Sequence, residues 1–84
     1  MSGLVLYHRR GCHLCEQMLA ALYVAYGDEL EVQLVDVDGD PKLKQAYGLR
    51  IPVLTGDGQV LCEASLDEAA VDAYFRRKAG LQMS

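Results

Sequence analysis

Apolar and polar residues recur along the chain with two different periods, and these periods predict its strands and helices. Residues 3–7 form a short apolar run with no polar face, which is typical of a strand buried on both faces. From Cys12 to about Tyr26, apolar residues recur at spacings of four, four and three, as on one face of a helix. Gly27 follows as a typical helix stop.

The middle of the chain predicts a second strand and a short helix. Residues 31–37 alternate apolar and polar positions and are rich in β-branched side chains. Asp40 and Pro41 come next, a typical N-cap and a typical first helical residue. We therefore expect a helix to about Tyr47 that ends at Gly48.

The last third of the chain predicts a hairpin and a helix. Residues 53–54 and 59–61 flank a turn-forming stretch that contains two glycines. Ser65 and Glu68 form a capping box before the last helix, and Gly80 closes it. We expect the inner face of this helix to carry Leu66, Ala69, Ala70, Ala73 and Tyr74.

The predicted order is strand, helix, strand, helix, strand, strand, helix. A β-α-β unit followed by a hairpin and a helix gives an α/β fold with a four-stranded mixed sheet flanked by helices. Because the sequence has no internal repeat, low-complexity tract or linker, we interpret residues 1–84 as one domain.

Charge and hydropathy exclude several classes of function. Lys and Arg number 8 against 12 Asp and Glu, and a net charge of -4 argues against nucleic-acid binding. The longest apolar run, residues 18–26, is far shorter than the roughly 20 residues of a membrane span. Residues 4–7 are too few for the apolar region of a signal peptide. We expect a soluble, cytoplasmic, monomeric protein.

The three cysteines narrow the chemistry. Cys12, Cys15 and Cys62 cannot all pair within the chain, so a structural disulfide framework of the secreted kind is not expected. A close C-x-x-C pair in a reducing compartment indicates redox chemistry or metal binding instead. Cys62 falls in a predicted strand, where we expect a buried residue without chemistry. A regulatory disulfide is the alternative for Cys62.

The Cys12–Cys15 pair stands at a strand-to-helix junction. Residues three apart share a helix face, so the two sulfurs can bond with little backbone movement. Cys12 at the helix start faces unsatisfied N–H groups, which favour the thiolate, and Arg9 and Arg10 add positive charge. Cys12 would then attack a disulfide, and Cys15, one turn deeper, would resolve the mixed disulfide.

Three other interpretations of the pair stay open. In the first, both cysteines are small buried apolar residues without chemistry. A zinc or iron–sulfur module would need about four ligands, to which His8, His13 and Cys62 could contribute beside the pair. A protein-interaction domain with an incidental disulfide is the third.

Two motifs carry a family resemblance. The stretch VLYHRRGCHLC at residues 5–15 resembles the strand, loop and C-x-x-C of glutaredoxin-like proteins in the thioredoxin superfamily. The stretch RIPVL at residues 50–54 resembles the cis-proline segment of that family. The element order matches over essentially the whole chain, so the resemblance implies a thioredoxin fold.

The resemblance also implies an activity. Cys12 would be the nucleophile and Cys15 the resolving cysteine of a thiol–disulfide oxidoreductase that acts on protein or glutathione disulfides in cell redox homeostasis. Pro52 would be cis beside the disulfide and would leave the Ile51 backbone free to pair with an extended peptide or glutathione. The family's chemistry needs no bound metal or organic cofactor. An external thiol such as glutathione, or a thiol reductase, would supply the electrons that reset the pair.

Two stretches depart from the family pattern. His13 and Leu14 stand between the cysteines, where glutaredoxins commonly carry Pro-Tyr. Residues 61–65, LCEAS, replace the Gly-Gly pair of glutathione-binding members, and Glu63 and Asp67 would repel a glutathione carboxylate. Arginines could attract the same carboxylates, and Ser65 at a helix N-terminus could offer N–H groups. We expect substrate or glutathione to be bound by Tyr7, Arg9, Arg10, Ile51, Pro52 and Ser65, and Arg50 could also attract a glutathione carboxylate.

Overall fold

The computed structural model describes residues 3–83, with side chains through residue 79. It confirms the predicted order of strands and helices and adds one turn of 3-10 helix, η1, before α2. The elements are β1 (Leu4–His8), α1 (His13–Tyr26), β2 (Val32–Asp36), η1 (Val37–Gly39), α2 (Pro41–Tyr47), β3 (Val53–Gly56), β4 (Gln59–Glu63) and α3 (Glu68–Met83).

The strands form one mixed sheet in the order β2-β1-β3-β4. β1 runs parallel to β2 and antiparallel to β3, and β4 returns antiparallel to β3. His8 pairs with Asp36, while Val53 lies between Tyr7 and Glu63. These pairs place the ends of β1, β2 and β4 and the start of β3 at one edge of the sheet. We call it the cysteine edge, because the loop that leads to Cys12 begins there.

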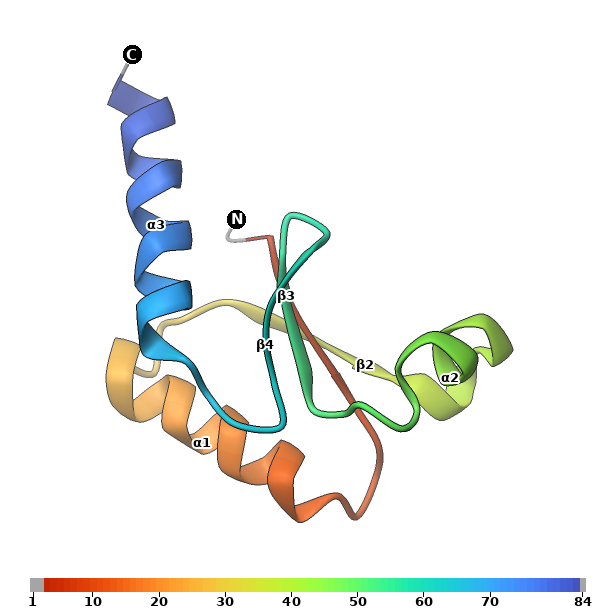
Figure 1. The fold of residues 1–84 in the computed structure, drawn as a ribbon. Coiled ribbons are helices and arrows are strands. Elements are labelled where there is room, and N and C mark those ends of the chain that lie inside the picture. Colours follow the sequence, from red (N-terminus) through yellow and green to blue (C-terminus); the bar gives the residue numbers. More distant parts are fainter. Residues whose placement is uncertain (1–2, 84) are drawn as a thin grey trace.

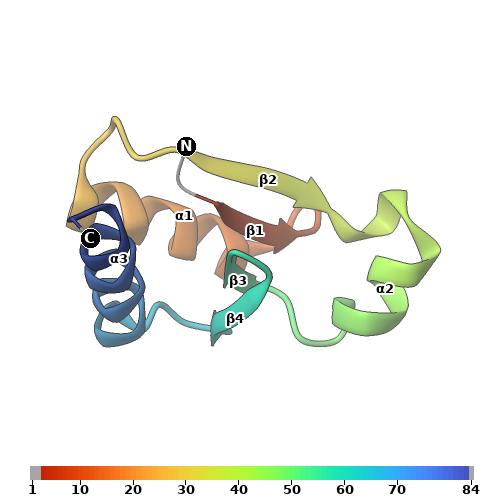
Figure 2. The same ribbon diagram turned by 90° about the horizontal axis from the view of Figure 1, so that it is seen from above.

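Helices cover the two faces of the sheet unequally. In both ribbon views α1 and α3 lie together, while α2 lies away from them beyond the end of β2 (Figure 1, Figure 2). The main core forms between the sheet and the pair α1 and α3, and burial of its apolar side chains is the main stabilising term. Its buried members are Leu4, Leu6, Met18, Leu22, Leu54, Cys62, Val71 and Tyr74.

The expectation that the first strand is buried on both faces is wrong. Leu4 and Leu6, which face α1, are 2% and 1% exposed, whereas Val5 and Tyr7 on the other face are half-buried. The other face is covered where Tyr47 of α2 stacks on Tyr7 with ring centroids 4.6 Å apart. A helix of seven residues is only about 10 Å long and cannot cover a five-residue strand of about 17 Å.

The last helix also differs from its prediction. Asp67, not Ser65, caps it, because the Ala70 N–H donates to Asp67 Oδ1 at 3.3 Å. The helix continues through Gly80 to Met83. Its buried side chains are Val71 and Tyr74, while the alanines expected on the inner face at positions 69 and 73 are exposed and Ala70 is half-buried. Tyr74 lies on the inner face as predicted, and Val71 joins it because larger apolar side chains gain more from burial than alanine.

The predicted helix boundaries at Gly27 and Asp40 and the predicted hairpin turn agree with the structure, whereas the second strand ends at Asp36, one residue earlier than predicted. Gly27 is the C-cap of α1, and the Asp40 carboxylate accepts a hydrogen bond from the Lys42 N–H at 2.8 Å at the start of α2. The hairpin turns at Asp57 and Gly58, which both have positive φ, as a tight hairpin turn requires. None of the helices in residues 3–83 is long and apolar enough to cross a membrane.

Candidate functional site

Cys12 and Cys15 occupy the first turn of α1. Cys12 is the N-cap residue, and its Sγ accepts a hydrogen bond from the Cys15 backbone N–H at 3.2 Å. Gly11 precedes it with a φ of 80°, a left-handed conformation that turns the loop from β1 into the helix. Cys12 is half-buried and Cys15 is 4% exposed, and both are free thiols. Cys12 is therefore accessible to a reactant, whereas Cys15 is buried.

The two thiols have different environments. Burial raises the pKa of the Cys15 thiol to about 11, and a hydrogen bond with the Cys12 side chain acts in the same direction. At neutral pH Cys15 is consequently a thiol, because burial disfavours the charged form. Cys12 sits instead at the end of the helix where backbone N–H groups favour negative charge.

The segment before β3 reaches the cysteine edge. The Ile51–Pro52 peptide bond is cis, and Pro52 is buried directly before Val53. The Pro52 carbonyl accepts a hydrogen bond from the Ala64 N–H at 2.9 Å, and the Ile51 N–H donates to the Tyr47 carbonyl at 3.1 Å. The expectation of a free Ile51 backbone is therefore wrong for its N–H, which the end of α2 occupies.

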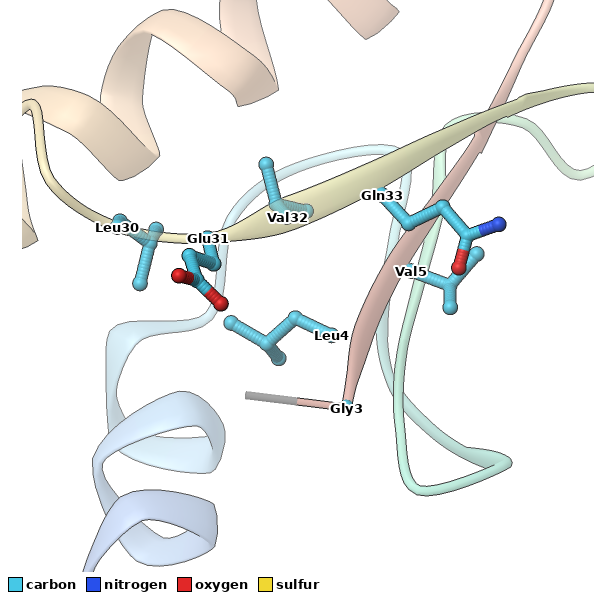
Figure 3. A pocket seen from close by; sticks show the side chains of 7 residues that line it. All are labelled: Gly3, Leu4, Val5, Leu30, Glu31, Val32 and Gln33. Atoms are coloured by element: carbon cyan, nitrogen blue, oxygen red, sulfur yellow. The ribbon is translucent and has the colours of Figure 1, made fainter. Parts of the chain in front are cut away.

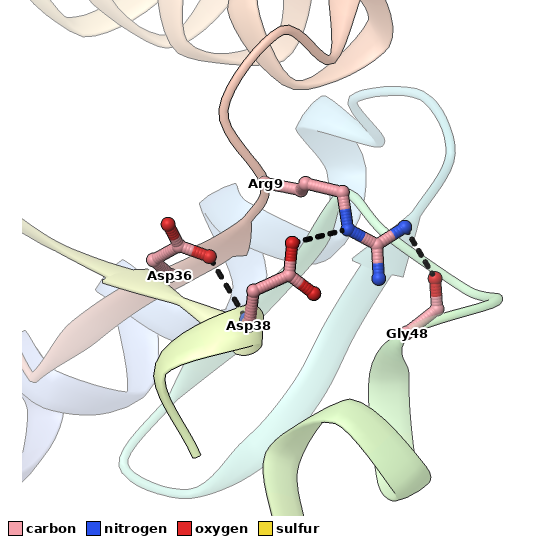
Figure 4. A network of polar contacts seen from close by, with 4 residues as sticks. All are labelled: Arg9, Asp36, Asp38 and Gly48. Atoms are coloured by element: carbon pink, nitrogen blue, oxygen red, sulfur yellow. Dashed lines mark hydrogen bonds and ion pairs between the residues drawn. The ribbon is translucent and has the colours of Figure 1, made fainter. Parts of the chain in front are cut away.

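Arg9 connects the loop before Cys12 to the α2 side of the sheet. Its Nε donates to Asp38 Oδ2 at 2.9 Å and its Nη1 to the Gly48 carbonyl at 3.5 Å, while the Asp36 carboxylate accepts from the Asp38 N–H (Figure 4). The Arg9 guanidinium holds the pKa of the Asp38 carboxyl below its usual value. Arg9 thus ties the loop in place, and a substrate anion would have to compete with Asp38 for it.

A second ion pair engages the arginine next to the cis-proline segment. Arg50 Nε lies 2.5 Å from Glu63 Oε1, and the guanidinium lowers the pKa of that carboxyl. The Arg50 guanidinium also lies 5.4 Å from the centroid of the Tyr47 ring. Arg10 is exposed, like Arg50, but differs from Arg9 and Arg50 because no described residue forms an ion pair with it.

Two other predicted binding residues lie to either side of the cysteine edge. Tyr7 is half-buried against Tyr47, on the face of the sheet away from α1. Ser65 is exposed and lines a cavity of about 210 Å³ with Leu14 and Met18 of α1. Its N–H donates to the Glu63 carbonyl at 2.7 Å, and α3 begins only at Glu68, so Ser65 does not offer the N–H of a helix N-terminus.

His13 and Cys62 are not part of a metal-binding cluster in the described residues. The His13 side chain is exposed, with Nδ1 3.8 Å from Glu16 Oε2. Cys62 is a buried core residue of β4, as expected, and burial raises the pKa of its thiol. Within residues 3–83, no three His, Cys, Asp or Glu side chains gather as a metal-binding group.

Cavities lie at both ends of the sheet. A cavity of about 440 Å³ is formed by the starts of β1 and β2, away from the cysteine edge, and its walls are apolar apart from Glu31 and Gln33 (Figure 3). A cavity of about 340 Å³ lies at the cysteine edge and is lined by His8, Cys15 and Asp36, among others. The sequence by itself suggests His8 only as a metal ligand. Its alternation with Leu4 and Leu6 is the signal that places it on the α1 face.

Comparison with known proteins agrees with this architecture. Protein Ne2328 of Nitrosomonas europaea, solved by NMR, has a similar structure with a TM-score of 0.77 and 38% sequence identity, covering 87% of this chain and 89% of its own. The X-ray structure of protein XcR50 from X. campestris has a TM-score of 0.70 and 36% identity, covering 88% of this chain and 96% of its own. No curated protein sequence matches the chain.

The sheet order, the flanking helices and these neighbours define a thioredoxin-like fold with a Cys-x-x-Cys pair at the start of its first helix. Residues 3–76 match the family described as Glutaredoxin-like domain (DUF836), and the chain belongs to this family.

Proposed function

We propose that the protein is a thiol–disulfide oxidoreductase that uses Cys12 and Cys15 as a redox pair. The observation that supports this most directly is the asymmetry of the two thiols. Cys12 is accessible and receives the Cys15 N–H at 3.2 Å, whereas Cys15 is buried beside it with a raised pKa. A nucleophile needs access and a stabilised thiolate, and a resolving thiol must stay protonated until the nucleophile has reacted.

The proposed reaction has two exchange steps. The Cys12 thiolate attacks one sulfur of a substrate disulfide, forms a mixed disulfide and releases the first substrate thiolate. Cys15 then loses its proton and attacks Cys12 Sγ, which forms the Cys12–Cys15 disulfide and releases the second substrate thiolate. The substrate gains two electrons and the cysteine pair loses two. An external thiol, such as glutathione, or a thiol reductase returns the pair to the dithiol.

The proposed substrates are protein disulfides and glutathione disulfide. An extended chain would lie along the segment before β3, with the Ile51 carbonyl accepting from it, because the Ile51 N–H is already bonded to Tyr47. Glutathione brings two carboxylates to the same edge. To bind Arg9 or Arg50 they would have to displace Asp38 or Glu63, which leaves Arg10 as the accessible cation.

Equilibration in glutathione redox buffers tests the proposal. Intact masses are read for the parent protein and for Cys12→Ser and Cys15→Ser. The parent should lose the mass of two protons as the buffer becomes oxidising, neither variant should do so, and glutathione should be trapped on Cys12 in Cys15→Ser. If the parent forms neither species at any ratio and instead carries stoichiometric zinc or iron, the metal-binding interpretation replaces this one.

A further inference from the structure

The cavity of about 340 Å³ at the cysteine edge is lined by the start of α1, the loop before it, and residues of β1 and β2. Leu6, Leu19 and Leu34 form its apolar part, and Cys15 also lines it. This volume is several times the roughly 30 Å³ that a water molecule occupies in the liquid, and polar groups line it, so it can hold water. The buried thiol is therefore next to a space through which a proton can move.

His8 is placed at this cavity by the register of the sheet. Side chains alternate along a strand, so His8 points to the same face as Leu4 and Leu6, which is the face that α1 covers. His8 is half-buried and is the last residue of β1, opposite Asp36 of β2. His8 and Cys15 thus line one cavity although they belong to different elements.

The resolving step creates a need for a proton acceptor. Cys15 attacks only as a thiolate, and burial raises its pKa to about 11, so few molecules carry that thiolate at neutral pH. A base within the cavity would take the proton when the mixed disulfide is formed, and such proton transfer contributes about 100-fold or more in many enzymes.

We propose that His8 accepts the proton of the Cys15 thiol in the resolving step, directly or through water in this cavity; this proposal rests on the proposed function. The S–H proton moves to an imidazole nitrogen, the Cys15 thiolate attacks Cys12 Sγ, and the substrate thiolate leaves. The imidazolium afterwards releases its proton to solvent.

The other charged groups around the cavity fit this role less well. Glu16 faces it from α1, Asp36 from β2, and Arg9 and Arg10 from the loop. Arginine stays protonated and cannot accept a proton. Carboxylates are weaker bases than imidazole, and the Asp36 carboxylate already accepts from the Asp38 N–H at 2.9 Å. Imidazole is the side chain suited to exchange protons near neutral pH.

A two-phase reaction with dithiobis-nitrobenzoate separates the steps. The reduced protein releases one coloured thiolate when Cys12 forms the mixed disulfide and a second when Cys15 resolves it. The second phase is intramolecular, so its rate does not depend on reagent concentration, which distinguishes it from slow direct attack by Cys62. Rates are followed by stopped flow from about pH 5 to pH 9.

His8→Gln should leave the first phase within about twofold and slow the second phase at pH 7 by about tenfold or more. In the parent, the rate of the second phase should rise with pH and then become constant. In His8→Gln this rate should keep rising by about tenfold per pH unit, because it then depends only on the fraction of Cys15 that is thiolate. The matched control is His13→Gln, because the chain has 2 histidines and His13 is exposed. Its second phase should match the parent.

Rescue by a small base separates proton transfer from a structural role. His8→Ala should recover part of the second-phase rate when imidazole is added, and Cys12 reactivity should not change. The proposed role of His8 would be overturned, without affecting the proposed redox function, by an unaltered second-phase rate in a folded His8→Gln. A second-phase rate of the parent that never becomes constant with pH would have the same meaning. A parent that releases no thiolate in a second phase would overturn the redox function itself.

Discussion

The backbone N–H of Cys15 donates a hydrogen bond to Cys12 Sγ at 3.2 Å, so the residue proposed to resolve the mixed disulfide also contacts the sulfur proposed to attack. The first backbone N–H groups of a helix have no intrahelical acceptor, and for the Cys15 N–H the Cys12 sulfur is the acceptor. The bond stabilises a thiolate more than a thiol, because hydrogen bonds to a charged acceptor are stronger than neutral ones. The C-x-x-C spacing therefore determines both how close the two cysteines lie and which backbone N–H donates to Cys12 Sγ.

Alkylation should separate the cysteines by pH. With iodoacetamide at pH 7 we expect the adduct on Cys12 first, because Cys15 is buried and its pKa is raised to about 11. The Cys15 rate should rise with pH by about tenfold per unit below that pKa, since only the thiolate reacts. Peptide mass spectrometry measures both rates, with Cys12→Ser to follow Cys15 alone. Equal rates at pH 7 would contradict the assigned environments.

Removing the negative partner of Arg50 should improve the use of glutathione. Glu63→Gln frees the guanidinium near the cis-proline segment, so Cys12 in a Cys15→Ser background should be glutathionylated several-fold faster, with stronger salt dependence. Asp57→Asn is the matched control, because it frees Lys78, whose partner Asp57 lies in the β3–β4 turn at the other end of the sheet. An equal gain in both variants would show a general charge effect rather than a local one.

Gly11→Ala should destabilise the protein through the backbone alone. Gly11 has a φ of 80°, and an added Cβ would meet no atom within 4 Å. The left-handed conformation costs a residue with a Cβ about 1–2 kcal/mol, and relief of that strain would shift Cys12. Gly39→Ala has equal space without positive φ and should change stability by less than about 0.5 kcal/mol. Urea unfolding of the reduced proteins measures both, and equal losses would refute the backbone explanation.

Two leucines provide a test of the core. Leu22 of α1 is 0% exposed, so Leu22→Ala should cost about 2–5 kcal/mol through lost burial and the cavity left behind. Leu49 is fully exposed, so Leu49→Ala should stay within about 0.5 kcal/mol. Thermal and urea unfolding give these values. A loss for Leu49→Ala as large as that for Leu22→Ala would contradict the burial assigned to these two side chains.

Local signals in the sequence predicted most of the fold. Asp40 and Pro41 begin α2, Gly27 ends α1, and the Asp57-Gly58 turn closes the hairpin, because each depends on backbone preferences of one or two residues. The same holds for the cysteine pair, since a C-x-x-C at a helix start determines its own N-cap geometry.

Predictions that depend on contacts between residues distant in sequence were only partly correct. The sequence predicts Tyr74 on the inner face of α3, which the structure confirms, but it also places three alanines there, whereas Val71 is the buried neighbour of Tyr74. Arg9 and Arg50 were expected to serve the substrate, yet each is paired with a carboxylate distant in sequence, Asp38 and Glu63. No local pattern encodes these pairs, because they depend on how α2 and β4 meet the cysteine edge.

The sequence by itself determined the order of the elements, the helix boundaries at Gly27, Asp40 and Gly48, and the position of Cys12 and Cys15 on one turn, since these follow from interactions between residues close in the chain. Only the tertiary structure decided which thiol is buried, which arginines are occupied, and that His8 of β1 shares a cavity with Cys15 of α1. These features depend on how β1 packs against α1, and the distance between these two elements is determined by the whole core.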